Sequence, residues 1–210
     1  MTSTPKHRSS AEQKAASELL EGARVLHETA QSLAAEIAQV AEEMIAALRA
    51  GGKIMACGNG GSAADAQHFA AELVGRFRRE RPGWAALALT VDASILTSLG
   101  NDFGFEQVFA RQVEALGRSG DILVAISTSG RSRNVLAAVA AAAKRDIRTV
   151  GLTGAGTSEL GKMVDRHLPI PSGNTAFIQQ GQMAVLHTLC ELIEEQLTNE
   201  TPPLPEKIDQ

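Results

Sequence analysis

The sequence predicts an α/β protein in which helices cover both faces of a parallel sheet, with further helix ahead of the sheet. After residue 52, short apolar runs alternate with stretches of helical periodicity, as in successive strand–helix units. The middle runs are apolar at almost every position, which is typical of strands buried on both faces. Before residue 52 the apolar side chains follow a helical repeat instead, which indicates a separate helical segment.

Residues 11–50 form this helical segment, in one piece or two. Apolar side chains recur every seven residues along it with two companions, namely Leu19, Leu26, Leu33, Val40, Ile37 and Met44. Such a stripe suits a helix packed on its own domain and equally a helix that pairs with other subunits of an oligomer. Gly51 and Gly52 are expected to end the segment.

Five apolar runs are the predicted strands: Lys53–Cys57, Ala85–Thr90, Asp121–Ile126, Arg148–Leu152 and His167–Pro171. The predicted helices after them span Ser62–Gly75, Ser94–Gly100, Glu106–Leu116, Ser132–Arg145, Thr157–Met163 and Thr175–Leu197. We therefore expect a disordered tip and helical segment in 1–50, one domain in 51–198 and a flexible, proline-rich tail in 199–210. Ligands of open parallel sheets bind beyond the carboxyl ends of the strands, so the chemistry is expected in the loops that follow them.

Composition excludes several classes of partner. A net charge of −4 and a pI near 5.8 leave no electrostatic footprint for nucleic acid, and 3% aromatic residues offer few stacking platforms. No apolar run approaches the ~18 residues of a membrane span, and no signal segment precedes the first helix, so we expect a cytoplasmic protein. Cys57 and Cys190 do not form a metal motif and are expected to be buried thiols.

The first predicted strand runs directly into a glycine-rich loop, CGNGGS. Gly58, Asn59, Gly60 and Gly61 permit a tight turn that brings backbone close to a ligand. Ser62 is expected at a helix N-terminus, where free N–H groups attract anions. The spacing is not the G-x-G-x-x-G of dinucleotide sites, and a glycine-rich turn after a strand is often only a turn, so both interpretations stay open.

The third predicted strand is followed by STSGRS, which places hydroxyls at Ser127, Thr128, Ser129 and Ser132. A phosphate monoester needs several donors around its oxygens, and this loop supplies hydroxyls and amide N–H groups together. The alternative is an N-cap serine among polar neighbours, but one cap needs only one hydroxyl. The loop lacks the lysine of nucleoside-triphosphate sites, so a smaller phosphate ester is expected.

Two helices carry candidate ligands or acid–base groups. His68 and Glu72 are four residues apart on the second predicted helix and share one face, and Arg76 would extend the same row. Such pairs are also common as surface salt links. The last helix carries Gln179 and His187, eight residues apart on an apolar segment, where a histidine often belongs to the core.

In combination these motifs resemble the phosphoheptose isomerase family of the SIS (sugar isomerase) fold. GNGGS, HFAxELxGR, GNDFGF at 100–105, STSGRS and the final helix with I-Q and a later His occur in that order. The resemblance covers about residues 15–197 and implies a flavodoxin-like three-layer sandwich with a five-stranded parallel sheet. It also implies a homotetramer with active sites between subunits and N-terminal helices in its centre.

The resemblance assigns roles residue by residue. Glu72 and His187 match the catalytic pair of an aldose–ketose isomerase that converts sedoheptulose 7-phosphate through an enediol. The metal set, usually for one zinc ion per subunit, is matched by His68, Glu72, Gln179 and His187. The substrate-binding positions are matched by Asn59, Gly60, Gly61, Ser62, Arg76, Asp102, Ser127, Thr128, Ser129, Ser132 and Gln179.

A non-catalytic relative, the DnaA initiator-associating protein DiaA, is the alternative. It shares the fold and both loops but lacks counterparts of Glu72 and His187, which favours an enzyme here. A sugar-phosphate sensor is a further possibility. The sequence also departs from the family pattern R-I-Q-E, because Phe177 and Gln180 replace its charged pair, and Gln182 stands where a His is usual.

Overall fold

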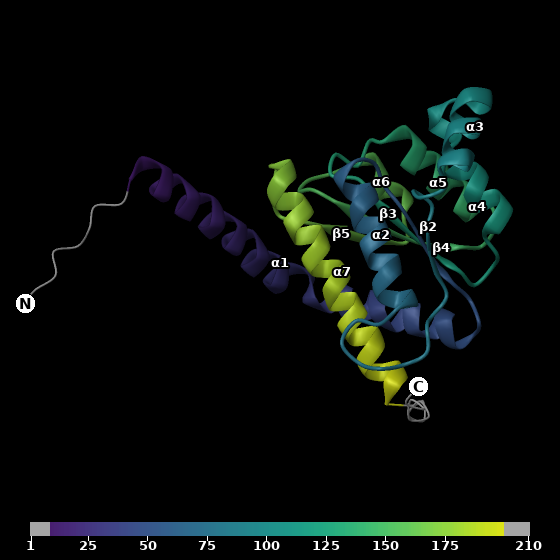
Figure 1. Cartoon of the computed structure of the whole chain (residues 1–210), viewed down its shortest axis with the longest axis horizontal. Helices are drawn as coiled ribbons and strands as arrows, with labels where there is room; N and C mark the ends of the chain where they lie inside the picture. Colours follow the sequence, from purple (N-terminus) through teal and green to yellow (C-terminus); the bar gives the residue numbers. More distant parts are fainter. Residues whose placement is uncertain (1–8, 200–210) are drawn as a thin grey trace, which may run out of the picture.

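Five parallel strands form the central sheet of the computed structural model, which describes residues 9–199 (Figure 1). The predicted tip before residue 9 and the tail from residue 200 lie outside the described residues. The strands are β1 Ile54–Cys57, β2 Ala86–Ala88, β3 Ile122–Ile126, β4 Arg148–Thr153 and β5 Arg166–Pro169. Their order is β2-β1-β3-β4-β5, the flavodoxin-like arrangement, so the predicted fold class is confirmed.

Within the sheet, β2 lies next to β1 on one side, and β3 lies next to β1 on the other side. Ile54 of β1 therefore pairs with Ala86 of β2 and with Ile122 of β3. The point where the order reverses opens a crevice at the carboxyl ends of β1 and β3. The glycine-rich loop follows β1 and the hydroxyl-rich loop follows β3, so the topology brings both loops to this crevice.

Helices cover both faces of the sheet and complete three layers (Figure 1). They are α1 Ser10–Arg49, α2 Gly61–Val74, α3 Ala93–Phe103, η1 Phe105–Gln107, α4 Ala110–Leu116, α5 Arg133–Ala143, α6 Glu159–Met163 and α7 Thr175–Thr198. Side chains alternate along a strand, so Ile54 and Ala56 face the core under α1, α2 and α7. Met55 and Cys57 face the opposite core under α4, α5 and α6.

Helix α1 is one continuous helix of 40 residues rather than two pieces. It begins at a capping box, in which the Ser9 hydroxyl accepts the N–H of Glu12 and the Glu12 carboxylate accepts the N–H of Ser9. Val40 and Met44 of the apolar stripe are buried on the domain, whereas Leu19 is 74% exposed. The N-terminal part of α1 projects from the body of the molecule (Figure 1). The stripe thus packs on its own domain from Leu33 onward, whereas Leu19 and Leu26 stay exposed.

Several predicted boundaries are wrong by a few residues. The helix expected over 106–116 is divided into η1 and α4, and Gly104 before it has a φ of 84°, which only glycine adopts readily.

Cys57 and Cys190 are buried unbonded thiols, as predicted, and burial raises the pKa of each to about 12. Among residues 9–199, no helix is both long and apolar enough to cross a membrane.

Candidate active site

Helices α2 and α7 lie side by side on one face of the sheet and carry a cluster of three ligand-type side chains (Figure 1). His68 and Glu72 come from α2, one helical turn apart, and His187 comes from α7. One ligand atom from each residue lies within 4.8 Å of the other two. Side chains that the sequence separates by more than one hundred residues therefore face one common point.

The cluster is held by short polar contacts. The Nε2 atom of His68 lies 2.9 Å from Oε1 of Glu72 and 3.3 Å from Nε2 of His187. The two imidazole rings meet edge to face with centroids 5.0 Å apart, and the Phe77 ring lies 5.5 Å from the His187 ring. Partial burial, followed by the nearby charge of His68, lowers the pKa of His187.

This donor set fits a divalent metal ion. Two imidazole nitrogens and one carboxylate oxygen are the three protein ligands that catalytic zinc sites commonly use, with a further position left open. The two facing Nε2 atoms are better suited to binding one cation between them than to carrying a proton each. Two protonated imidazoles with these atoms 3.3 Å apart would repel each other. The geometry of His68, Glu72 and His187 is therefore that of a candidate metal centre.

Gln179 lies in the first turns of α7, next to the start of α2. A Cβ added to Gly61 would overlap the carboxamide of Gln179, so the side chain lies against the backbone of Gly61. This position joins Gln179 to the glycine-rich loop. Its predicted double role, as substrate contact and as fourth metal ligand, stays a prediction.

The glycine-rich loop makes a tight turn between β1 and α2. Gly60 has a φ of 56° and is the N-cap of α2, which begins at Gly61, one residue earlier than predicted. The carboxamides of Asn59 and Asn134 exchange two hydrogen bonds of 2.8 Å, which joins this loop to the start of α5. Ser62 is buried, and its N–H donates to the carbonyl of Asn59.

The hydroxyl-rich loop turns between β3 and α5. Ser132 is the N-cap residue of α5, yet its side chain makes no capping bond, and its Oγ lies 2.9 Å from Oγ of Ser127. The Ser129 hydroxyl accepts the N–H of Arg131 at 3.3 Å, and the Thr128 carbonyl accepts the N–H of Gly154. An N-cap serine alone therefore does not account for the loop, and Ser127 and Ser132 face each other across it.

Two of the predicted site residues are placed apart from the cluster. Helix α2 ends at Val74, so Arg76 does not extend the row of His68 and Glu72 as predicted; it lies in the following loop, 3.4 Å from Glu80. The backbone of Gly75, with φ −81° and ψ −102°, ends the helix there. Asp102 is exposed on α3 and accepts a bond from Asn101.

Sequence reasoning missed two side chains beside the cluster. Phe77 lies against His187, but a phenylalanine after a helix carries no sequence signal for this. Asp65 precedes His68 by one turn and has an Oδ2 atom that is buried without a hydrogen-bond partner in the described structure. Burial raises the pKa of Asp65. Its i, i+3 spacing to His68 was a usable signal, because both then lie on one helix face.

The sequence and the fold are similar to those of known proteins. The sequence model of the SIS domain family matches residues 20–154. The phosphoheptose isomerase of Aromatoleum aromaticum is 54% identical over 83% of this chain and 89% of its own length. That of Methylibium petroleiphilum is 47% identical over 90% of this chain and 96% of its own length. The chain belongs to the phosphoheptose isomerase family of SIS-domain proteins.

Solved structures of the phosphoheptose isomerase family support the same conclusion. The enzyme from Neisseria gonorrhoeae superposes with a TM-score of 0.84 at 45% identity, over 89% of this chain and all of that one. The Francisella tularensis enzyme gives a TM-score of 0.85 at 40% identity with the same coverage. The NanR protein of Vibrio vulnificus shares only the fold, at 20% identity and a TM-score of 0.60. This member of the phosphoheptose isomerase family is a sugar-phosphate isomerase.

Proposed function

We propose that the protein converts D-sedoheptulose 7-phosphate to D-glycero-D-manno-heptose 7-phosphate, for cell-envelope heptose precursors in the cytoplasm. The observation that carries this proposal is the convergence of His68, Glu72 and His187 from two helices. A non-catalytic binding protein of the same fold has no use for a carboxylate and two imidazoles at one point. The relatives named phosphoheptose isomerase provide the substrate class.

Zinc, one ion per subunit, is the proposed cofactor. His68, Glu72 and His187 would hold it, with Gln179 as the proposed fourth ligand. Two imidazoles and a carboxylate favour zinc among the abundant divalent ions, although the same set accepts others. When bound, the ion would supply Lewis-acid polarisation of the sugar carbonyl.

The protein's own residues would move the protons. Isomerisation removes a proton from C1 of the ketose, passes through an enediol and returns a proton to C2. Glu72 is the proposed base for the carbon-bound proton, because it is the carboxylate of the cluster and its Oε1 lies 2.9 Å from Nε2 of His68. His187 approaches from the opposite helix and would serve the proton on the neighbouring oxygen or on the ring oxygen.

The substrate phosphate would bind in the hydroxyl-rich loop. Ser127, Thr128, Ser129 and Ser132 stand at the carboxyl end of β3 with the first amides of α5. The glycine-rich loop, Asn59 to Ser62, lies across the same crevice because Asn59 bonds to Asn134 of α5. Anchoring the phosphate there would hold the reacting carbons still, so that remote binding energy assists the reaction.

Subunit assembly belongs to the proposal as well. An apolar groove of about 420 Å³ lies between α1 and α7 and is lined by Leu26, Ile37, Val185 and Leu192 among others. Leu19 and Leu20 stay 74% and 71% exposed on the projecting end of α1. Their contact with α1 and α7 of further copies in a homotetramer would cover these side chains. Arg76 and Asp102, apart from the cluster in one chain, would line sites formed between subunits.

The decisive experiment incubates the purified, zinc-loaded protein with sedoheptulose 7-phosphate and follows the carbon signals by NMR. We expect an aldoheptose phosphate to appear. Its formation should stop when a chelator is added and resume when zinc is restored. Binding of the ketose phosphate without any product would instead identify a sensor. A protein that neither binds nor converts it, but binds an initiator protein, would be of the DiaA type.

A further inference from the structure

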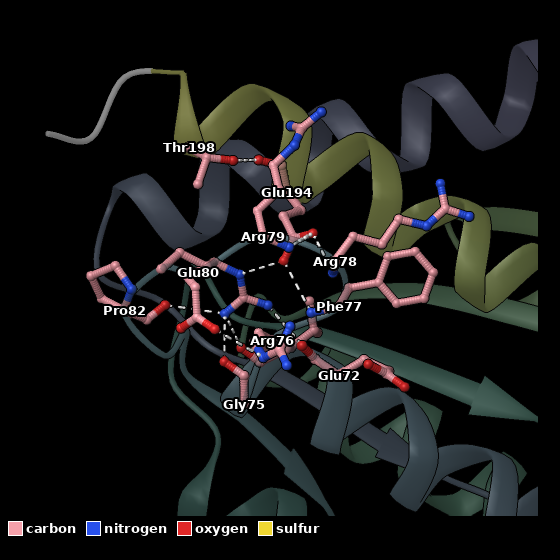
Figure 2. A network of polar contacts seen from close by, with 12 residues as sticks. Glu72, Gly75, Arg76, Phe77, Arg78, Arg79, Glu80, Pro82, Glu194 and Thr198 are labelled. Carbon is pink, nitrogen blue, oxygen red and sulfur yellow. Dashed lines mark hydrogen bonds and ion pairs between the residues drawn. The ribbon is translucent and has the colours of Figure 1, made fainter. Parts of the chain in front are cut away.

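A buried ion pair joins the loop after α2 to helix α7 (Figure 2). Nε of Arg81 donates to Oε1 of Glu194 at 2.9 Å, and both side chains are only 1% exposed. The Glu194 carboxylate also accepts the backbone N–H groups of Phe77, Arg78 and Arg79 at 3.0, 2.7 and 2.9 Å. Every oxygen of this buried carboxylate is therefore bonded, which offsets the cost of removing the charge from water.

The guanidinium of Arg81 binds the C-terminal end of α2 at the same time. Its Nη2 donates to the carbonyl of Glu72 at 2.7 Å, and its Nη1 donates to the carbonyl of Leu73 at 2.9 Å. The last carbonyls of a helix have no partner within the helix, and a cation there also interacts well with the helix dipole. The Trp84 ring covers the guanidinium at 3.6 Å from its centroid.

Both ends of this contact lead to the candidate metal centre. Arg81 holds the backbone of Glu72, whose carboxylate bonds to His68. Glu194 lies seven residues, about two turns, after His187 on the same helix. Phe77, whose N–H binds Glu194, places its ring against His187. The pair thus connects the C-terminal end of α2 to α7, about two turns from His187.

We propose that Arg81 and Glu194 are positioning residues that set the separation of Glu72 and His187 required for metal binding, an inference that rests on the proposed function. A buried ion pair by itself contributes little net stability, and apolar side chains of similar volume would fill the same space. Apolar side chains could not bind three amides of the loop and the carbonyls of Glu72 and Leu73 together. A guanidinium group, which presents several N–H donors in one plane, can do so when it is paired with a carboxylate.

The test compares the zinc affinity of the full-length wild type with that of Arg81→Lys and Glu194→Gln, by competition with a chromogenic chelator. Lysine keeps the charge but loses the fork, so the carbonyl of Glu72 and the carboxylate of Glu194 cannot both be bound. We expect each variant to lose about tenfold or more in affinity, as for outer residues that orient metal ligands. Cobalt-loaded protein should show an altered visible spectrum, and kcat should fall while KM stays near that of the wild type.

Asp121→Asn is the matched control for a general loss of stability. Asp121 is a buried carboxylate at the amino end of β3 that binds Lys53 and the N–H of Arg118, away from the candidate centre. Equal zinc affinity in the wild type and Arg81→Lys would overturn the inference alone. The inference would also be overturned if Asp121→Asn, at the same stability as Arg81→Lys, lost as much zinc affinity. A wild type that binds no divalent ion would overturn the proposed centre, and the inference with it.

Discussion

The Nε2 atoms of His68 and His187 lie 3.3 Å apart, although 119 residues separate them along the chain. The contact exists because α2 and α7 pack side by side on one face of the sheet. Glu72 joins them from the next turn of α2. The proposed chemistry depends on this one contact between two helices.

Replacing the carboxylate of Glu72 tests the proposed base. Glu72→Gln keeps the size of the side chain but cannot accept a proton at neutral pH, so we expect kcat to fall by about a hundredfold or more. Steady-state kinetics at saturating zinc provides the measurement. Glu114→Gln, an exposed change on α4, should leave kcat unchanged. Unaltered turnover in Glu72→Gln would remove Glu72 from the proton transfer.

Removing one hydroxyl of the loop after β3 tests phosphate binding. Ser129→Ala should raise KM by about tenfold with little change in kcat, because the lost bond to a charged group is equal in the ground and transition states. Ser32→Ala removes an exposed hydroxyl of α1 that bonds only within its helix in the structure, and it should change neither constant. A fall in kcat at constant KM in Ser129→Ala would contradict the phosphate assignment.

The loop backbone can be tested at Gly130, which has a φ of 62°. An added Cβ would overlap Ser158, with its Oγ only 2.6 Å away. Gly156 has a φ of 89° and open space around it, so Gly156→Ala carries the backbone strain without the overlap. We expect Gly156→Ala to cost about 1 kcal/mol in urea unfolding and Gly130→Ala clearly more. Equal losses would show that Ser158 does not restrict this turn.

The lowered pKa of Glu194 predicts how the stability of the folded protein depends on pH. Burial alone would raise its pKa, but the three backbone N–H groups and Arg81 outweigh burial and lower the pKa below its ordinary value. Its ionised form therefore stabilises the fold fully above the unfolded-state pKa of about 4.3, and this contribution is lost as pH falls through the lower folded-state value.

Urea unfolding of the wild type and Glu194→Gln across pH 7 to 3 checks this sign. The free-energy difference between them should be constant above about pH 5 and should shrink below about pH 4. A difference that stays the same at every pH would mean that the pKa of Glu194 is the same in the folded and the unfolded protein.

Several departures from the family pattern have a structural account. Gln180 and Phe177 lie against Gly22 of α1, where an added Cβ would come within 2.6 Å of Oε1 of Gln180. Gln182 is fully buried, and its Nε2 donates to the carbonyl of Leu152 in β4 at 3.1 Å. These residues therefore serve the packing of α7 against α1 and the sheet, and they lie outside the cluster of His68, Glu72 and His187.

Local pattern was sufficient for much of the fold. Runs such as Ile122–Ile126 are apolar throughout because both of their faces are covered, and that property is written in consecutive residues. The hydroxyl-rich loop and the pairing of His68 with Glu72 are local as well, since four residues span one helical turn. The link from these to Gln179 and His187 came from resemblance to a family, because nothing in the spacing along the chain requires it.

The sequence by itself determined the strands, the loops that follow them and the two residues that share a face of α2. Only the tertiary structure decided that His187 faces His68 and that Arg81 meets Glu194. The physical reason is range. Periodicity and turn chemistry act over a few residues, whereas these contacts depend on how two helices pack on one sheet after more than one hundred intervening residues.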